Sequence, residues 1–159
     1  MSRQAAGGFS VGVVQTRDLS EREAEVLALL LEPEFPGVEA LRRQAATARV
    51  TGRCPCGCAT IYLATDPAAA AAEGVPDSPP SAVFAHGRPR GDDRPGPGLH
   101  LDVLDGRLSA IEIVSFDEMV EASVFGVFPA PEEFEAPEVP QVNRRSWRRL
   151  IDPLLRRRG

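Results

Sequence analysis

All three cysteines of this chain lie within five residues, in the segment Cys54-Pro55-Cys56-Gly57-Cys58. Thiolates bind zinc strongly, and three thiolates with one imidazole make the four-ligand set of a closed zinc site. The sequence has two histidines, and each is a candidate for the fourth ligand. The candidate metal ligands are therefore Cys54, Cys56 and Cys58, together with His86 or His100.

The spacing of the cysteines argues against this site. Structural zinc sites usually place two residues between paired cysteines, so that one turn presents both sulfur atoms. With a single residue between them, Cys54, Cys56 and Cys58 in an extended strand would lie on one face with neighbouring side chains about 7 Å apart. The spacing therefore favours cysteines that serve as small apolar residues of a turn, with no cofactor, and leaves zinc as the alternative.

Two further kinds of thiol chemistry remain open. One cysteine could act as a nucleophile with His86 or His100 as its base. A disulfide between Cys56 and Cys58 could act as a redox switch, although so tight a ring is strained. In a reducing compartment clustered cysteines indicate free thiols or a metal before they indicate a disulfide.

Composition limits the class of protein. A chain of 159 residues fits one domain with a single core. The start lacks a secretory signal, and no segment approaches the roughly 20 apolar residues that span a bilayer, so we expect a cytoplasmic protein without a transmembrane segment. The net charge of −5 argues against general nucleic-acid binding.

The N-terminal part predicts two helices. Ser20 and Glu23 have the spacing of a capping box, in which each side chain accepts a hydrogen bond from the other residue's backbone N–H group. A second helix is expected over 38–48, with Leu41 toward the core and Gln44 toward water. The short link between the two helices predicts a helical hairpin.

Short strands are expected on both sides of the cysteine segment. Residues 49–51 and 60–64 are rich in β-forming side chains, so the cysteines should lie on a turn between paired strands. Residues 66–74 carry an N-cap, a first-turn proline, an alanine run and a final glycine, which predict two turns of helix. Another strand is expected over 82–85.

The clearest supersecondary signal is a β-hairpin over 99–115. An Asp-Gly pair at 105–106 is typical of its two-residue turn. The apolar residues on the two strands are out of phase by one residue, and a β-bulge at 109–110 would bring them onto one face. That register would place His100 opposite Glu112.

This hairpin also carries a resemblance. The residues Gly-Arg-Leu-Ser at 106–109 and Ile-Glu-Ile at 111–113 resemble the hairpin of small uncharacterised bacterial α+β domains that pair a helical N-terminus with a CGC-type turn. The matching turn here is Cys-Gly-Cys at 56–58. The resemblance covers about residues 20–115 and implies the architecture without implying an activity.

Together these elements predict one α+β domain, in which an N-terminal helical hairpin packs on one face of an antiparallel sheet of about five strands. Residues 1–19 would form an N-terminal arm or edge strand, and residues 20–128 would form the domain. Residues 129–159 would form a proline-rich acidic segment followed by an arginine-rich amphipathic tail.

The tail is a candidate surface for a partner. Residues 141–159 hold seven arginines and one aspartate, whereas residues 117–140 hold seven acidic residues and no arginine. Apolar side chains in the tail recur at helical spacing, so the tail either docks on the protein's own core or binds a partner. The candidate partner-binding residues are Trp147, Arg148, Arg149 and Leu150.

Two functions follow from these observations. The first is a small cytoplasmic, non-catalytic module that binds another protein, by analogy in size and charge with immunity or antitoxin-like proteins. The second is a zinc- or thiol-dependent protein centred on Cys54, Cys56 and Cys58.

Overall fold

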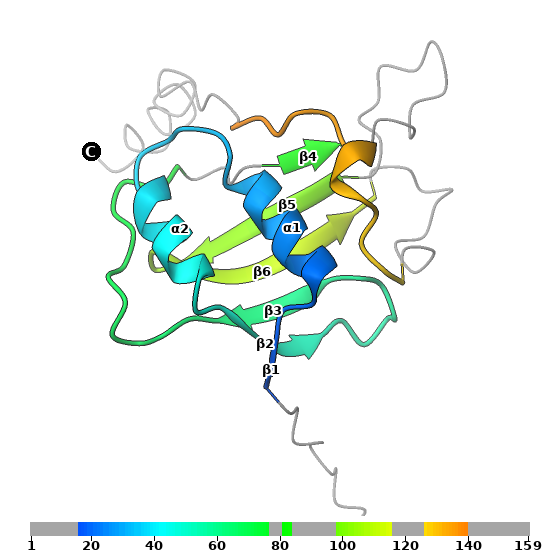
Figure 1. Ribbon diagram of the computed structural model, residues 1–159, viewed down its shortest axis with the longest axis horizontal. Coiled ribbons are helices and arrows are strands. Elements are labelled where there is room, and N and C mark those ends of the chain that lie inside the picture. The colour runs from blue at the N-terminus through cyan, green and yellow to red at the C-terminus, as the bar shows by residue number, and fades with distance from the viewer. Residues whose placement is uncertain (1–15, 77–80, 84–97, 116–125, 140–159) are drawn as a thin grey trace, which may run out of the picture.

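A computed structural model describes residues 16–76, 81–83, 98–115 and 126–139. Two helices, α1 (Glu21–Leu30) and α2 (Val38–Ala45), cover one face of an antiparallel sheet (Figure 1). The predicted α+β architecture is confirmed. Within the described ranges, neither helix has the length and apolar character needed to cross a membrane.

Within the described residues, the sheet has six strands in the order β1-β2-β3-β6-β5-β4, and every neighbouring pair is antiparallel. The sixth strand has two residues and pairs with the outer edge of β2, within the segment 1–19 for which an arm or an edge strand was expected. The strands are β1 (Arg17–Asp18), β2 (Arg49–Arg53), β3 (Ile61–Ala64), β4 (Ser81–Val83), β5 (Gly98–Leu104) and β6 (Arg107–Val114).

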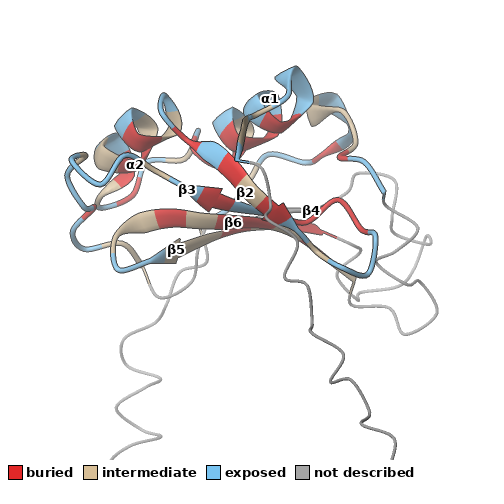
Figure 2. Ribbon diagram, turned by 90° about the horizontal axis from the view of Figure 1, so that it is seen from below, coloured by how far each residue is buried: buried red, intermediate tan, exposed pale blue. Residues whose placement is uncertain are grey.

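The core lies between the helices and the sheet, as the burial colours in Figure 2 show. Side chains of both helices and of the central strands are fully buried there, among them Val26, Leu30, Leu41, Ile61, Leu99, Leu101 and Ile111. A 3-10 helix, η2 (Pro131–Glu133), lies against α1, and Phe134 directly after it is buried in the same core. One apolar layer therefore joins segments from both ends of the described chain.

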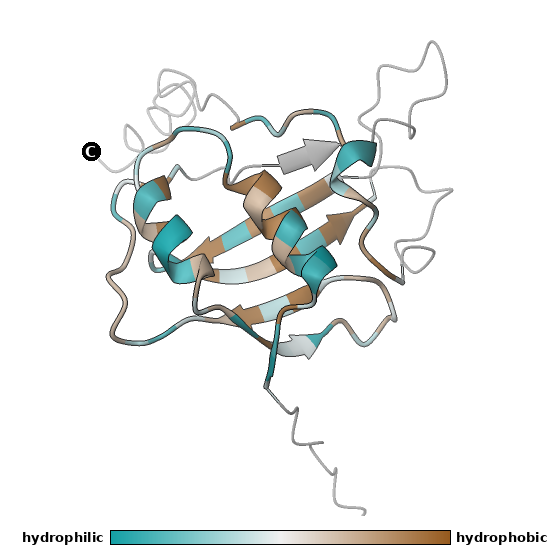
Figure 3. Ribbon diagram, in the orientation of Figure 1, coloured by the Kyte–Doolittle hydropathy of each residue, from teal (hydrophilic) through white to brown (hydrophobic). Residues whose placement is uncertain are grey.

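The β5–β6 hairpin has the predicted register. His100 pairs with Glu112, and the register shifts between Asp102 and Val103, so that Ser109 is the extra residue of a bulge on β6. Figure 3 shows the resulting alternation of apolar and polar residues along β5. The bulge directs the apolar side chains of both strands into the core, as the sequence indicated.

The start of α1 is fixed by an ion pair between the buried Glu23 and the partly exposed Arg17. Ser20 and Glu23 form the predicted capping box. The Glu23 carboxylate also accepts two 2.7 Å hydrogen bonds from the Arg17 guanidinium, which joins α1 to β1. Burial alone would raise the pKa of Glu23, but the hydrogen bonds from Arg17 and Ser20 outweigh it and hold the pKa below its ordinary value.

Replacing Glu23 by glutamine should therefore lower stability in a pH-dependent way. The lowered pKa stabilises the fold fully above the unfolded-state value of about 4.3, and this contribution is lost as the pH falls through the folded-state value. We expect Glu23→Gln to reduce the free energy of unfolding by about 1–2 kcal/mol at pH 7. Urea titrations from pH 7 to pH 3 would show the difference from the wild type becoming smaller as the pH falls.

Glu25 provides the matched control on the same helix. Its ion pair with Arg22 is exposed on both sides, with side-chain exposures of 45% and 43%. Exposed pairs contribute little, so Glu25→Gln should change stability by less than about 0.5 kcal/mol. Equal effects of the two substitutions would contradict the role assigned to Glu23.

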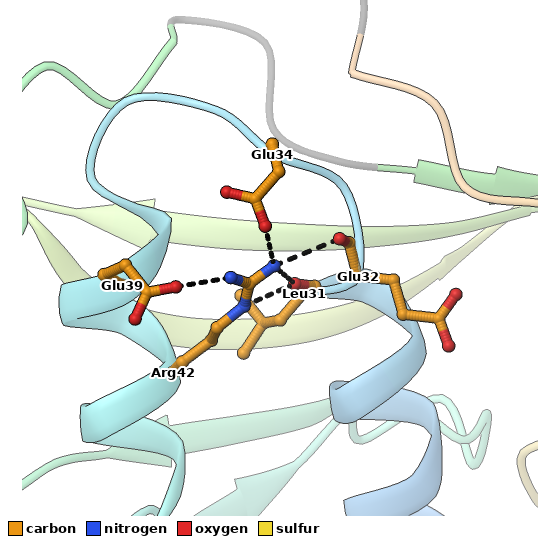
Figure 4. A network of polar contacts seen from close by, with 5 residues as sticks. All are labelled: Leu31, Glu32, Glu34, Glu39 and Arg42. Atoms are coloured by element: carbon orange, nitrogen blue, oxygen red, sulfur yellow. Dashed lines mark hydrogen bonds and ion pairs between the residues drawn. The ribbon is translucent and has the colours of Figure 1, made fainter.

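Arg42 joins the end of α1 to α2 (Figure 4). Its guanidinium donates hydrogen bonds to the main-chain carbonyls of Leu31 and Glu32, which have no partner within the helix. The same group contacts the carboxylates of Glu34 and Glu39. Arg42 thus caps α1 from the neighbouring helix.

Gln44 corrects one prediction. It was expected to face water, but it is fully buried. Its amide nitrogen donates to the carbonyls of Ala70 and Gly106, each at 2.9 Å, and its amide oxygen accepts from the N–H of Leu108 at 3.0 Å. A single side chain thereby ties α2 to the tip of the β5–β6 hairpin.

The helix predicted over 66–74 is wrong. Asp66 forms a local turn instead, with its carboxylate accepting from the N–H of Ala68 at 2.8 Å. Arg107 donates to the carbonyls of Asp66, Pro67 and Ala69, each at 3.0 Å. The Asp66 carbonyl also accepts from the N–H of Ala69 at 3.0 Å, which closes a single turn, and the bonds to Arg107 tie this irregular segment to the hairpin.

Candidate metal centre

The cysteine segment forms a tight loop between β2 and β3. The N–H of Cys54 donates to the carbonyl of Thr60 at 3.0 Å, which closes the base of the loop. Within it, the N–H of Gly57 donates to the carbonyl of Cys54 at 3.2 Å, so Pro55 occupies the second position of a β-turn, where proline is favoured. Gly57 has a φ of +89°, which lets the chain reverse before Cys58.

This loop brings the three thiols together. The Sγ atoms of Cys54, Cys56 and Cys58 all lie within 4.8 Å of one another, and those of Cys54 and Cys56 are 3.0 Å apart. The turn folds the segment back on itself, so all three sulfurs lie closer together than the separation of about 7 Å that an extended strand would give. All three cysteines are free thiols.

The thiols differ in exposure. Cys58 is buried at the edge of the core, Cys54 is half-buried against it, and Cys56 is exposed. The buried and half-buried sulfurs are held by packing, whereas the third faces solvent. A ligand bound to the three sulfurs would therefore be anchored on the protein side and accessible on the other.

The sulfur positions suit one tetrahedral metal ion. A Zn–S bond of about 2.3 Å places the sulfurs of a tetrahedral site about 3.8 Å apart. That spacing falls between the shortest separation here, 3.0 Å, and the 4.8 Å limit that bounds all three. Small side-chain rotations would bring the three sulfurs to ligand distance.

Of the two predicted histidine ligands, His100 is not part of this group. His100 lies on β5 and pairs with Ser81 and Glu112. Strand β6 separates β5 from β3, the strand that follows the cysteine loop. Among the described residues, neither a histidine nor a carboxylate joins the three thiols. His86 falls outside the described ranges, so its prediction as a ligand stays a prediction.

His100 belongs to a second polar group, on the sheet face opposite the helices. Burial lowers the pKa of His100, and the nearby charge of Asp102 offsets part of this effect. Burial raises the pKa of Glu112, and the charge of Asp102 and a hydrogen bond with it raise this pKa further. The carboxyls of Asp102 and Glu112 and the imidazole of His100 thus form one polar group on β5 and β6.

Glu112→Gln should stabilise the protein at neutral pH. Because the pKa of Glu112 is raised on folding, its ionisation opposes folding, and stability falls as the pH rises from about 4.3 through the raised value. The amide would keep a donor toward Asp102 without the repulsion. We expect a gain of about 0.5 kcal/mol at pH 7, within the range for like-charged cross-strand pairs.

Thermal unfolding at pH 7 and at pH 3 would measure this gain. The advantage of the variant should be present at pH 7 and absent at pH 3, where Glu112 is largely protonated in both the folded and unfolded chains. A variant less stable than the wild type at pH 7 would show that the Glu112 carboxylate is needed for its contacts.

The candidate partner-binding residues Trp147, Arg148, Arg149 and Leu150 lie outside the described residues. Comparison of the chain with protein-family models, with curated proteins and with solved structures finds no match. The cysteine loop is therefore the feature of the described chain that points to a function.

Sequence reasoning missed two residues that shape this region. Thr60 is buried, its carbonyl closes the loop, and its hydroxyl accepts from the N–H of Ile113 at 3.0 Å on β6. Gly126 lies against the loop, near the carbonyl of Gly57. Their roles depend on contacts with distant segments, and no local motif marks them.

Proposed function

We propose that this protein binds a single zinc ion through Cys54, Cys56 and Cys58. The observation that supports the proposal is the convergence of three free thiols within 4.8 Å in a loop closed by backbone hydrogen bonds. Convergent thiolates repel one another without a cation, and a divalent ion removes this repulsion. Zinc is the metal whose bond length and tetrahedral preference fit these sulfur positions.

The proposed site has three protein ligands and one open position. Such sites hold water or another ligand at the fourth position, in contrast with closed four-ligand structural sites. Cys56 is exposed, so the open position would face solvent. The site would thus allow exchange of the ion, or capture of a ligand from outside the loop.

Zinc binding would also stabilise the fold. Cys58 and Cys54 both contact the core, so an ion bound to them favours the folded state. A ligand present at about 1,000 times its Kd adds about 4 kcal/mol to the free energy of unfolding. Binding would release protons, because the thiols must be deprotonated to act as ligands.

The test is native mass spectrometry of the reduced, full-length chain titrated with zinc. We expect one bound ion per chain, and tight binding of cobalt(II) with a thiolate-to-metal charge-transfer band in the near ultraviolet. The control is a chain with Cys54→Ser, Cys56→Ser and Cys58→Ala together. A wild-type chain that binds no more zinc than this control would overturn the proposal.

A parallel titration with copper(I) under anaerobic conditions tests the identity of the metal. Soft thiolate ligands also select copper(I), which shares this chemistry. If thiolate affinity alone decides, copper(I) should displace zinc when both metals are at equal free concentration. Complete absence of zinc binding alongside tight copper(I) binding would reassign the metal.

The interaction-module function stays a prediction. It depended on the acidic surface and on the tail residues Trp147 to Leu150. These tail residues lie outside the described ranges. No contact within the described part of the chain favours it over metal binding.

A further inference from the structure

Two of the three thiols, those of Cys54 and Cys56, contact each other. The Sγ atoms of Cys54 and Cys56 are 3.0 Å apart, about 1 Å longer than a disulfide bond. Both side chains reach solvent at least in part, whereas Cys58 is buried. The pair that contacts is therefore also the pair that an oxidant can reach.

We propose that Cys54 and Cys56 form a reversible disulfide, and that this disulfide and the metal exclude each other. The second half of this inference rests on the proposed zinc site, whereas the first half does not. The pairing differs from the Cys56–Cys58 disulfide considered from the sequence. The structure favours Cys54 because its sulfur already contacts that of Cys56 and because Cys58 is enclosed by the core.

The chemistry requires a hydroperoxide as the oxidant. The exposed Cys56 thiolate attacks the O–O bond, which yields a sulfenic acid at Cys56 and releases water or an alcohol. The Cys54 sulfur then attacks the Cys56 sulfur, the S–S bond forms, and the hydroxyl leaves as water. Overall, two thiols lose two electrons and two protons, and the peroxide is reduced by the same two electrons.

Reduction would reverse the bond by thiol–disulfide exchange. A dithiol attacks one sulfur to form a mixed disulfide, and its second thiol then displaces the protein thiol. A disulfide within a Cys-Pro-Cys turn closes a small ring, and strained, exposed disulfides are the labile ones. The bond is therefore suited to a reversible change rather than to permanent stabilisation of the fold.

Disulfide and metal compete for the same sulfur atoms. Thiolates are the zinc ligands, so formation of the disulfide leaves Cys58 as the single thiol ligand. One thiolate without further protein ligands does not hold zinc tightly. Conversely, a bound ion would move the sulfurs of Cys54 and Cys56 apart to about 3.8 Å and occupy their lone pairs, which would protect them from oxidation.

The test of the disulfide uses the metal-free, reduced, full-length chain treated with hydrogen peroxide. We expect titratable thiols to fall from three to one, the intact mass to fall by two hydrogen atoms, and peptide mapping to join Cys54 to Cys56. Dithiothreitol should restore all three thiols. The Cys58→Ala variant should form the same bond, whereas Cys56→Ser should not form an intramolecular disulfide at the same rate.

A bond from Cys58 to either partner, or direct overoxidation of Cys56 to sulfinic acid without a disulfide, would overturn the inference. Because this experiment uses no metal, its outcome is independent of the zinc proposal. A disulfide in a chain that never binds zinc would uphold the pairing and overturn the competition.

The test of the competition uses the zinc-loaded chain and a chromogenic chelator. Peroxide should release the ion together with loss of two thiols, and disulfide formation should be at least about 10-fold slower than in the metal-free chain. An ion that stays bound after the Cys54–Cys56 bond has formed would overturn the competition while leaving zinc binding itself intact.

Discussion

Replacing Cys58 by alanine is expected to weaken zinc binding about 100-fold or more. Apparent binding free energies of structural zinc sites are about 10–16 kcal/mol for four ligands, or about 3 kcal/mol for each ligand. A loss of about 3 kcal/mol corresponds to a factor of more than 100 in Kd. Competition with a chromophoric chelator at fixed pH would measure the change.

Alanine is the appropriate replacement because Cys58 is buried among apolar side chains, where a serine hydroxyl would lack a partner. The matched control is Val50→Ala, which also removes a buried side chain from this core but leaves all three thiols. It should cost about 2 kcal/mol of stability while leaving the Kd for zinc unchanged. Cys58→Ala with wild-type affinity would contradict a three-thiolate site.

The cysteine loop shows why the sequence reading of this site was incomplete. Cysteines separated by one residue have distant sulfurs when the backbone is extended, and the spacing was interpreted for that conformation. The actual conformation depends on the turn preferences of Pro55 and Gly57 and on the hydrogen bond between Cys54 and Thr60, which no local pattern marks. A turn was predicted correctly, but the convergence of side chains within it depends on backbone angles that residue types do not specify.

Local signals predicted much of the fold. The capping box of α1 and the bulged hairpin were both confirmed, since each depends on residues close in sequence or on an apolar pattern that admits one register. The predictions that failed depend on contacts between residues far apart in the sequence. Gln44 is buried through partners 62 and 64 residues away, at Gly106 and Leu108.

The same hairpin tip explains the wrong helix at 66–74. Its cap and alanine run favour a helix, but short isolated helices are marginal in water. The carbonyls of this segment instead accept hydrogen bonds from Arg107, and the N–H of Ala72 donates to the carbonyl of Gly106 at 2.8 Å. Tertiary contacts therefore outweighed a local preference that was weak at the outset.

Gly106→Ala should be the most destabilising conservative substitution at the hairpin tip. Gly106 has a φ of +71°, and an added Cβ would lie 2.4 Å from the carbonyl oxygen and 2.8 Å from the nitrogen of Ala72. These are backbone atoms, so relief requires the chain near Ala72 to move away. That movement would break the bond from the Ala72 N–H and would disturb Gln44, which bonds to the same Gly106 carbonyl.

We expect Gly106→Ala to lower the free energy of unfolding by about 3–5 kcal/mol, which combines left-handed strain of about 1–2 kcal/mol with the clash and lost hydrogen bonds. Gly57→Ala is the matched control, since Gly57 has a φ of +89° but no atom within 4 Å of the added Cβ. It should cost only the strain, about 1–2 kcal/mol in the metal-free protein. Urea denaturation of both metal-free variants would compare them. Equal losses would show that backbone strain, and not the close approach to Ala72, makes glycine necessary at the hairpin tip.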